Sequence, residues 1–474
     1  MYPVKLVTLF LSVVWLLSLG AITVRGVSGP GAWPYTPWST NKAQVKNARG
    51  ETVTIVGANW PGAGETMLPE GLQYSSARSI VERLAQAGFN FVRHTYATQM
   101  IDEIEEGAVP GKDVTLAWAL KNGLGLAAGT NVLAQVLKNN PQWTAETPRM
   151  KIWSDIANLE RDNGIMMHLD NHVSKPMWCC SNTDGNAFFG DRYFDIARWT
   201  RGLSKMARWA IDHPNVASMS LRNELRPVEP ATAAVEYSWT AWASNVTAGA
   251  NAIHTANNNL LITISGLSYD LTLAPITREL DLSVVDQKKA GTPPVYFRID
   301  DHAWHEKAVL ELHSYDHKGI TTPCDIIEAN LYNNGFNALG ITPPLGCASG
   351  PTSSTVDPTG KVACYPAKRL TPVWLTEFGQ KQTDPILHLN TCLRDFTVKH
   401  KIGWAMWAAV GSYYTRQNTA DFDETWGLFT HDWSAWRNQT TFTGWWMQFI
   451  QQMSPTNVEK PQAASPPPKL SSVP

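Results

Sequence analysis

Short runs of apolar and β-branched residues alternate with longer amphipathic segments along most of this chain. In the first such unit, residues 54–59 have a strand pattern, residues 75–87 place their apolar side chains on one helical face, and residues 90–94 have a strand pattern again. The strand pattern recurs at residues 165–171, 216–223, 260–264, 308–313, 373–376 and 403–407. Eight strands, most of them alternating with helical stretches, predict an α/β fold, the closed parallel (β/α)8 or TIM barrel. A doubly wound open sheet is the alternative, but no glycine-rich phosphate loop follows the first strand.

The length of the chain fits a barrel with insertions. Its 474 residues exceed the usual single domain, but a barrel reaches this size when its loops are long. We expect the barrel domain to span residues 21–453. Two long insertions, at residues 107–149 and 316–368, each follow the C-terminal end of a strand, the rim where barrel proteins build their binding sites. They predict long rim loops that decide how open the site is.

The two ends of the chain have compositions of their own. Lys5 precedes an uncharged, mostly apolar run at residues 6–19, and small residues follow it. This pattern predicts a signal peptide over residues 1–20, and therefore a secreted, extracellular protein that leaves the membrane after cleavage. An uncleaved anchor is the alternative, since the uncharged run extends to Val24. Residues 454–474 are rich in proline and serine and predict a disordered tail.

The cysteines agree with export. The chain has six of them: Cys179, Cys180, Cys324, Cys347, Cys364 and Cys392. In an exported protein of this size we expect disulfides that fix long loops, although the spacing does not choose among the possible pairings. A disulfide between neighbours is strained, so we expect Cys179 and Cys180 to pair with different partners. Sequons at Asn245 and Asn438 predict N-glycosylation.

The charge balance argues against a nucleic-acid or membrane-surface partner. Lysine and arginine number 39 and aspartate and glutamate 41, a formal net charge of −2. A neutral ligand fits this balance better than a polyanion. Tryptophan occurs 21 times, and indole faces in polar loops can stack on sugar rings. We expect a monomer without a cofactor.

Polar and titratable side chains stand where the predicted strands end. Glu224 follows the strand at residues 216–223, and Glu377 follows the strand at residues 373–376. Since parallel barrel strands all point their C-terminal ends to one face, these side chains should converge there. The full set is Asn59, Arg93, His172, Asn223, Glu224, His313, Tyr315, Glu377 and Trp407. Two carboxylates in such a cluster are what acid/base chemistry on a glycosidic bond requires.

These strand ends resemble glycoside hydrolase family 5, the cellulase-type retaining β-glycosidases, over roughly residues 33–453. The stretch from residue 175 to residue 191 is similar to a plant and fungal branch of that family. The resemblance rests on Arg93, Asp170-Asn-His172, Asn223-Glu224, His313-Ser-Tyr315, Glu377-Phe-Gly and Trp407. It implies a (β/α)8 barrel that hydrolyses a β-linked polysaccharide or glycoside, as an endo-β-1,4-glucanase does.

The resemblance and the chemistry together assign roles to the two glutamates. Glu377 is expected to be the nucleophile, kept ionised by Arg93 and Tyr315, because donors to a carboxylate favour its charged form. Glu224 is expected to be the acid/base, with a raised pKa. A retaining enzyme needs its carboxyl groups about 5–5.5 Å apart, and an inverting one roughly 6.5–9.5 Å.

Six residues are expected to bind the substrate, a β-linked glycan or glycoside of glucose or mannose type: Arg93, His172, Asn223, His313, Tyr315 and Trp407. Asn223 is placed to bond the sugar 2-hydroxyl, a contact that strengthens in the transition state. Trp407 is expected to form the floor under the reacting ring. His172 and His313 are expected to shape that part of the site.

Two other functions remain as alternatives. His168, Asp170 and His172 alternate along one strand and share a face, a spacing that could hold Zn²⁺ or Mn²⁺ in a metal-dependent hydrolase. Loss of activity on chelation would favour this metal-dependent alternative. The other is a non-catalytic carbohydrate-binding barrel, which replacement of Glu224 or Glu377 by Gln would leave unaffected.

Overall fold

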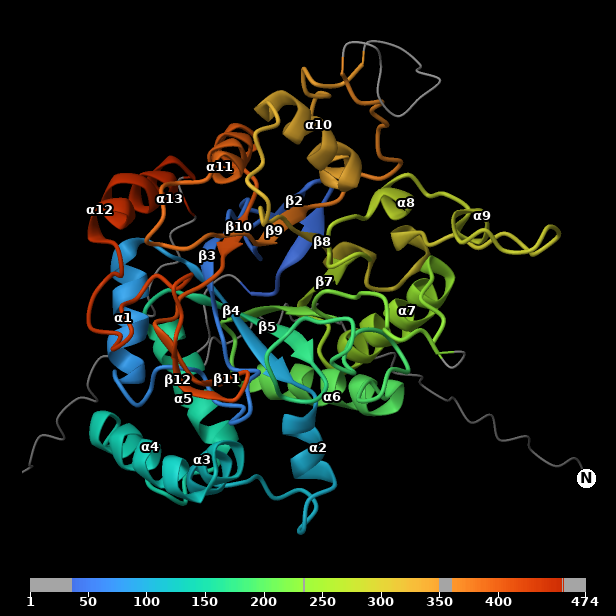
Figure 1. Ribbon diagram of the computed structural model, residues 1–474. Helices are drawn as coiled ribbons and strands as arrows, with labels where there is room; N and C mark the ends of the chain where they lie inside the picture. Colours follow the sequence, from blue (N-terminus) through green and yellow to red (C-terminus); the bar gives the residue numbers. More distant parts are fainter. Residues whose placement is uncertain (1–35, 233–234, 349–359, 454, 456–474) are drawn as a thin grey trace, which may run out of the picture. The chain divides into compact units, whose positions relative to one another are not determined.

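The eight predicted strands form a closed barrel. The computed structural model describes residues 36–232, 235–348, 360–453 and 455, so the expected signal peptide at 1–20 and the expected tail, apart from Pro455, lie outside the described residues. Every neighbouring pair of barrel strands is parallel, in the order β10-β3-β4-β5-β6-β7-β8-β9 (Figure 1). These strands are β3 (Val56–Trp60), β4 (Phe91–Ala97), β5 (Met166–Val173), β6 (Val216–Ser220), β7 (Leu261–Ser265), β8 (Ala308–His313), β9 (Val373–Glu377) and β10 (Trp404–Met406). The predicted (β/α)8 class is confirmed.

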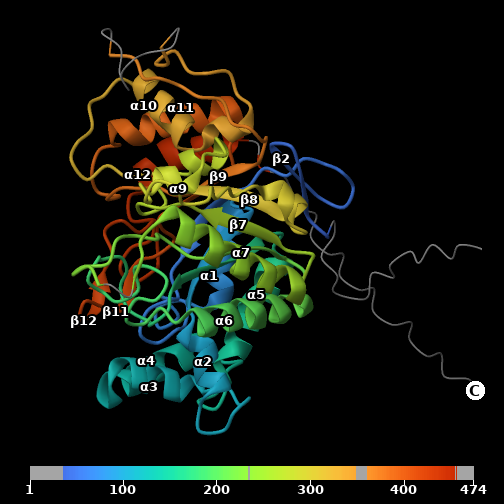
Figure 2. The ribbon, with the colours of Figure 1, turned by 90° about the vertical axis from the view of Figure 1, so that its right-hand side faces the viewer.

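Helices surround the barrel in Figures 1 and 2. In helix α1, Ser76 caps the N-terminus by accepting from Ser79 N–H, and Gly88 ends the helix with φ 97°, a left-handed conformation that glycine adopts without a steric penalty. The α-helices of the described residues are α1 (Ala77–Ala87), α2 (Gln99–Glu105), α3 (Leu116–Leu124), α4 (Leu126–Asn139), α5 (Arg149–Asp162), α6 (Ile196–Trp209), α7 (Trp239–Ala256), α8 (Ala274–Thr277), α9 (Leu282–Val285), α10 (Cys324–Asn334), α11 (His388–His400), α12 (Gln439–Thr441) and α13 (Met447–Met453). None of them is both long enough and apolar enough to cross a membrane.

The barrel interior changes from apolar to polar along the strands. Two short antiparallel strands, β1 (Ser39–Asn41) and β2 (Gln44–Lys46), form a hairpin whose Val45 joins the apolar cluster at the start of the barrel strands. That cluster is Trp38, Val45, Val53, Ile55, Phe91, Met166, Ala217, Leu261, Val309, Trp374 and Ala405. Two residues after the cluster members Phe91 in β4 and Val309 in β8 come Arg93 and Glu311, whose side chains are both buried. One end of the barrel is therefore packed shut, and the chemistry is left to the other end.

The two insertions contain more regular structure than rim loops. Residues 107–149 form helices α3 and α4, and residues 316–368 contain α10. Figures 1 and 2 place α3 and α4 on the opposite side of the barrel from α10. A second hairpin, β11 (Ser412–Arg416) with β12 (Thr419–Asp423), follows the last barrel strand.

The disulfides correct one prediction. Cys179 and Cys180 form a disulfide with each other, not with different partners as expected. The reason is that the other four cysteines pair among themselves, with Cα–Cα distances of 5.2 Å for Cys324–Cys392 and 5.5 Å for Cys347–Cys364, both normal for a disulfide. The first of these pairs joins residues 68 positions apart, a contact that the spacing of cysteines in the sequence does not reveal.

Candidate active site

Glu377 and Glu224 come from the ends of two barrel strands, β9 and β6, that are separated by β7 and β8. Glu377 is the last residue of β9 and is 4% exposed. Strand β6 ends at Ser220, so Glu224 lies on the connection beyond it, where its φ of 45° is left-handed and unusual for a residue other than glycine. Asp270 holds this turn, because its Oδ2 accepts from the Glu224 backbone N–H at 2.8 Å. A carboxylate that fixes an unfavourable backbone conformation is typical of a site where geometry matters.

The two carboxylates approach each other across His313. One carboxylate oxygen of Glu224, one of Glu377 and one ring nitrogen of His313 lie within 4.8 Å of one another. His313 Nδ1 is 3.1 Å from Glu224 Oε1 and 3.7 Å from Glu377 Oε2. Burial lowers the pKa of His313 to about 4, so the ring is neutral near pH 7 and has one N–H to donate. The structure therefore brings the two glutamates together around a neutral imidazole.

Both oxygens of Glu377 accept hydrogen bonds. Arg93 Nη1 donates to Oε1 at 2.5 Å, and the Tyr315 hydroxyl donates to Oε2 at 2.9 Å. Burial, reinforced by the nearby negative charge of Glu377, raises the pKa of Tyr315 well above its usual value, so the phenol keeps its proton. These two donors suit an ionised carboxylate and not a protonated one.

Arg93 is the centre of a buried network. Its guanidinium lies 3.0 Å from Asp170 and 3.9 Å from Glu311, and it donates to the side-chain oxygens of Asn59 and Asn223, each at 2.9 Å. Burial alone would lower the pKa of Arg93, but the charges of Asp170, Glu377 and Glu311 outweigh it and raise the pKa. Asn59 in turn donates to the backbone carbonyls of Thr376 and Met406. Arg93 thus fixes both Glu377 and Asn223 from behind.

Glu224 has a different environment from Glu377. Its side chain is 15% exposed, and burial raises its pKa, with Arg226 and His172 opposing part of that rise. No arginine donates to its side chain among the described residues; Arg226 donates to its backbone carbonyl at 2.8 Å. The structure therefore holds one carboxylate between strong donors and leaves the other in a setting that favours its protonated form.

His172 and Trp407 form an aromatic pair beside the glutamates. Their rings stack with centroids 5.7 Å apart and an angle of 12° between the planes. Asp170 accepts from His172 Nδ1 at 2.6 Å, and the pKa of Asp170 falls to about 2 because Arg93 and His172 outweigh the effect of burial. An ionised Asp170 can only accept, which fixes the Nδ1–H tautomer of His172.

A cavity of about 490 Å³ joins these residues. Of the predicted site residues, Arg93 and His313 are buried behind the wall. Arg93 contacts the lining residues Glu377 and Asn223, and His313 contacts Glu224. The lining consists of His172, Trp178, Cys179, Cys180, Asn223, Glu224, Tyr269, Leu271, Tyr315, His317, Glu377, Trp407, Arg416, Glu424 and Trp426. Among the described residues of the two insertions, only His317 is part of this lining.

Several lining residues were not among the predicted ones. Arg416 and Glu424 form an ion pair on and beside the β11–β12 hairpin, and the Arg416 guanidinium carbon lies 3.4 Å from the ring centroid of Trp178. Asp270 and Glu311 were also missed. Glu311 could have been found, since a glutamate two residues before His313 inside an apolar strand must face the barrel interior. Asp270 gave no such signal, because it lies in an irregular connection after β7.

The side chains proposed for the metal alternative are engaged elsewhere. His168 Nδ1 bonds Ser218 Oγ at 2.7 Å, and Asp170 is held by Arg93. Within the part of the chain that the structure describes, three groups of side chains could surround a cation: His172 with Cys179 and Cys180, Cys324 with His388 and Cys392, and Glu224 with His313 and Glu377. The first two groups include cysteines that are already joined in disulfides. The triple of His168, Asp170 and His172 is not one of the three groups.

Comparisons with known proteins agree on one family and one fold. A family model described as cellulase (glycosyl hydrolase family 5) matches residues 47–412. A curated protein of Chamaecyparis obtusa named "Glycosyl hydrolase 5 family protein" is 31% identical over 400 residues; the match covers 83% of this chain but 62% of that protein's length.

Two enzymes of known structure, one from an archaeon and one from Xanthomonas campestris, have a similar fold. An endocellulase of the archaeon Pyrococcus horikoshii aligns with a TM-score of 0.58 at 15% identity, over 90% of this chain and 99% of that chain. The catalytic domain of the major endoglucanase of Xanthomonas campestris aligns with a TM-score of 0.54 at 15% identity, over 88% and 99%. At this identity the likeness shows the fold alone.

Proposed function

The chain belongs to glycosyl hydrolase family 5, and we propose that it is a retaining β-glycoside hydrolase in which Glu377 is the nucleophile and Glu224 the acid/base. One observation carries the proposal: the two carboxylates lie within 4.8 Å of each other in opposite electrostatic settings. Arg93 and Tyr315 donate to Glu377, whereas burial raises the pKa of Glu224. A carboxylate held by two donors beside a carboxyl group whose pKa is raised is suited to split the nucleophile and acid roles.

The first step forms a covalent intermediate. Glu377 attacks the anomeric carbon, and Glu224 gives its proton to the departing glycosidic oxygen, so the aglycone leaves neutral. In the second step the ionised Glu224 takes a proton from water, and the resulting hydroxide displaces Glu377 from the anomeric carbon. Two inversions at one carbon give net retention.

The separation of the carboxylates supports retention over inversion. An inverting enzyme keeps its carboxyl groups roughly 6.5–9.5 Å apart to leave room for a water molecule, whereas a retaining enzyme holds them at about 5–5.5 Å. The approach within 4.8 Å of one oxygen from each glutamate fits the shorter spacing.

The cavity supports a neutral sugar as substrate. Trp178, Trp407 and Trp426 line it, and tryptophan offers a flat apolar face to a pyranose ring. The Pyrococcus horikoshii enzyme is an endocellulase, and variants of it have been crystallised with cellotetraose. We therefore propose that the substrate is a β-linked glucan or glucoside, with a mannose-type glycan as the alternative. The proposed activity is like that of an endo-β-1,4-glucanase.

We also propose that the protein is secreted. The three disulfides support this, because disulfides persist in oxidising compartments. Mass spectrometry of the secreted protein would identify its N-terminus and any glycans at Asn245 and Asn438.

The activity is tested by a substrate screen with detection of the product anomer. The chain is incubated with cellulose, mixed-linkage glucan, mannan, xylan and para-nitrophenyl β-glycosides, and NMR follows the first anomer released. We expect the β-anomer to appear first from a β-linked substrate. Prompt appearance of the α-anomer would exclude the double displacement, and turnover of none of the substrates would exclude the proposed function.

A further inference from the structure

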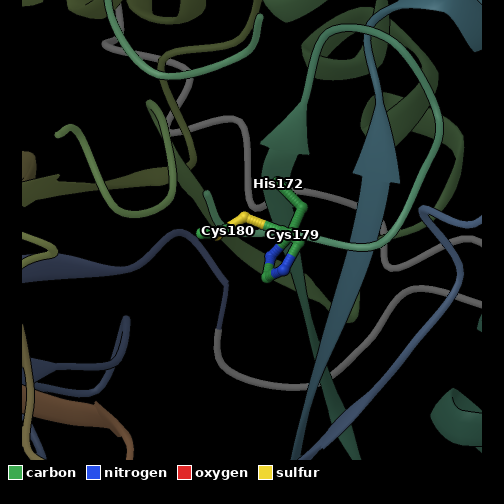
Figure 3. A group of neighbouring side chains, drawn as sticks. All are labelled: His172, Cys179 and Cys180. Atoms are coloured by element: carbon green, nitrogen blue, oxygen red, sulfur yellow. A yellow bond between two sulfur atoms is a disulfide. The ribbon is translucent and has the colours of Figure 1, made fainter. Parts of the chain in front are cut away.

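The Cys179–Cys180 disulfide lies in the wall of the cavity that holds the two glutamates. Both cysteines line it, and a ring nitrogen of His172 and the two sulfur atoms lie within 4.8 Å of one another (Figure 3). The other two disulfides, Cys324–Cys392 and Cys347–Cys364, join residues that do not line this cavity. Its position next to the proposed chemistry calls for an explanation that fold stability alone does not give.

The disulfide contacts the side-chain amide of Asn223. Asn223 Nδ2 lies 3.5 Å from Cys180 Sγ and 3.9 Å from Cys179 Sγ, while Oδ1 of the same amide accepts from Arg93 at 2.9 Å. The amide is therefore held at both ends, by a guanidinium on its oxygen and by sulfur on its nitrogen. Sulfur is a weak acceptor, so it orients the NH₂ group without competing strongly for its protons.

A disulfide differs from every polar side chain that could occupy this place. It has no proton to donate and carries no charge. It therefore presents an apolar surface to a ligand and leaves an N–H of Asn223 available to a sugar hydroxyl. A serine pair would instead bring two hydroxyl groups that compete for the same amide.

The loop that carries the disulfide is attached to the segment that carries Glu224. Arg226 donates to the backbone carbonyls of both Ser181 and Glu224, at 3.0 and 2.8 Å. Its guanidinium also pairs with Asp184 at 2.6 Å. The disulfide, Asn223 and Glu224 are thus held together as one unit.

We propose that the Cys179–Cys180 disulfide is a positioning and contact element of the sugar site: it packs against the sugar and orients Asn223 toward the 2-hydroxyl. The proposal rests on the proposed glycosidase function and adds a residue pair that sets how the reacting sugar is held. Because a bond to the 2-hydroxyl strengthens in the transition state, loss of the disulfide should affect turnover more than folding.

The test compares substrates with and without the 2-hydroxyl. The double variant Cys179→Ala/Cys180→Ala and the matched control Cys347→Ala/Cys364→Ala are assayed on para-nitrophenyl β-glucoside, β-mannoside and the 2-deoxy β-hexoside, which is the common analogue of both. For the accepted 2-hydroxy substrate we expect kcat/KM of the first variant to fall about tenfold, the scale of one hydrogen bond, mainly through kcat. For the 2-deoxy analogue, which loses only the packing contact, we expect a clearly smaller fall, and the control should match the wild type on both.

The outcomes separate this inference from the proposed function. An equal loss on the 2-hydroxy and 2-deoxy substrates, or no loss beyond that of the control, overturns the role of the disulfide while the glycosidase stands. No turnover of any substrate by the wild-type chain overturns both.

A second measurement avoids any folding defect of the double variant. Glu224→Gln is treated with a phosphine reductant with and without the substrate that the wild type accepts, and alkylated peptides are quantified by mass spectrometry. Bound sugar should slow labelling of Cys179 and Cys180 several-fold and leave Cys347 and Cys364 unchanged. Equal labelling with and without sugar contradicts the contact.

Discussion

Glu224 and Glu377 each hold a carboxylate oxygen near the same atom, Nδ1 of His313, at 3.1 and 3.7 Å. The imidazole is neutral near pH 7, because burial lowers its pKa to about 4. A neutral ring can donate one hydrogen bond without adding a positive charge that would lower the pKa of Glu224. Arg93 supplies the positive charge on the other side, at Glu377. This asymmetry leads to the first two predictions.

Replacement of each glutamate should give a distinct product with azide. In Glu377→Ala, azide can attack the anomeric carbon directly, and an activated substrate should yield the α-glycosyl azide. In Glu224→Ala, azide should attack the glycosyl-enzyme, which needs no general base, and yield the β-glycosyl azide. Without azide we expect losses of about 10²–10⁴ in turnover for Glu224→Ala.

A matched control for this experiment is Glu311→Gln. Glu311 is a buried barrel glutamate that accepts from Ser220 and Thr263 and does not line the cavity, and glutamine keeps its size and an acceptor oxygen. It should keep measurable turnover without azide. If Glu311→Gln is as inactive as the Glu377 variant, or if both alanine variants give the same anomer, the assigned roles are wrong.

The alkaline limb of the pH profile should belong to Glu224. The first step needs Glu224 protonated, and burial raises its pKa above 4.5. The kcat/KM should therefore fall as pH rises through that raised value. In Glu224→Gln, assayed on an aryl glycoside whose leaving group needs no proton, this limb should disappear. Persistence of the same limb in the variant would assign it to another group.

Chelation should leave the activity unchanged. His168 is bonded to Ser218 and Asp170 to Arg93, so neither is free to ligate a metal without losing a buried partner. We expect full turnover after exhaustive dialysis against EDTA, and measurable turnover in His168→Asn. Loss of activity that Zn²⁺ or Mn²⁺ restores would support the metal-dependent alternative instead.

His168 should make the protein less stable in mild acid. Burial lowers its pKa to about 3, whereas an unfolded histidine has a pKa of about 6.5. Between these values the unfolded chain binds the extra proton, so stability is lost as pH falls below about 6.5. The contribution is about 1.4 kcal/mol per pH unit.

This effect is measured as a difference, because the raised pKa of Glu311 acts in the opposite direction. Denaturant unfolding from pH 7 to pH 5 should show a steeper loss of stability on acidification for the wild type than for His168→Asn. Equal slopes would mean that His168 is protonated in the folded chain.

The barrel was predictable because its strands are buried on both sides and read as apolar runs. All eight predicted segments overlap the observed strands. Their ends were less certain: the strand predicted to reach Asn223 ends at Ser220 in the structure, because the chain must turn to place Glu224 against Asp270. That turn depends on a residue almost fifty positions away, which local pattern cannot reveal.

The candidate site also has one part that the sequence predicts and one part that it does not. Arg93, His313 and Glu377 lie in barrel strands, so their convergence follows from the fold. Arg416 and Glu424 come from a hairpin and its flank, whose path is fixed by contacts such as the Arg416–Trp178 stacking and not by any periodicity. The prediction that Cys179 and Cys180 pair with different partners was wrong for a related reason, since their pairing depends on where the other cysteines lie.

The cavity wall has a consequence for how this scaffold can change. Arg93 and Glu377 lie in barrel strands, whereas much of the lining comes from connections at residues 178–180, 269–271 and 416–426. The connection at residues 416–426 carries neither glutamate nor Asp270, so it could be exchanged for a segment of another shape while the carboxylates stay in place. New sugar preferences could therefore arise, in evolution or by grafting, without the reaction having to be reinvented.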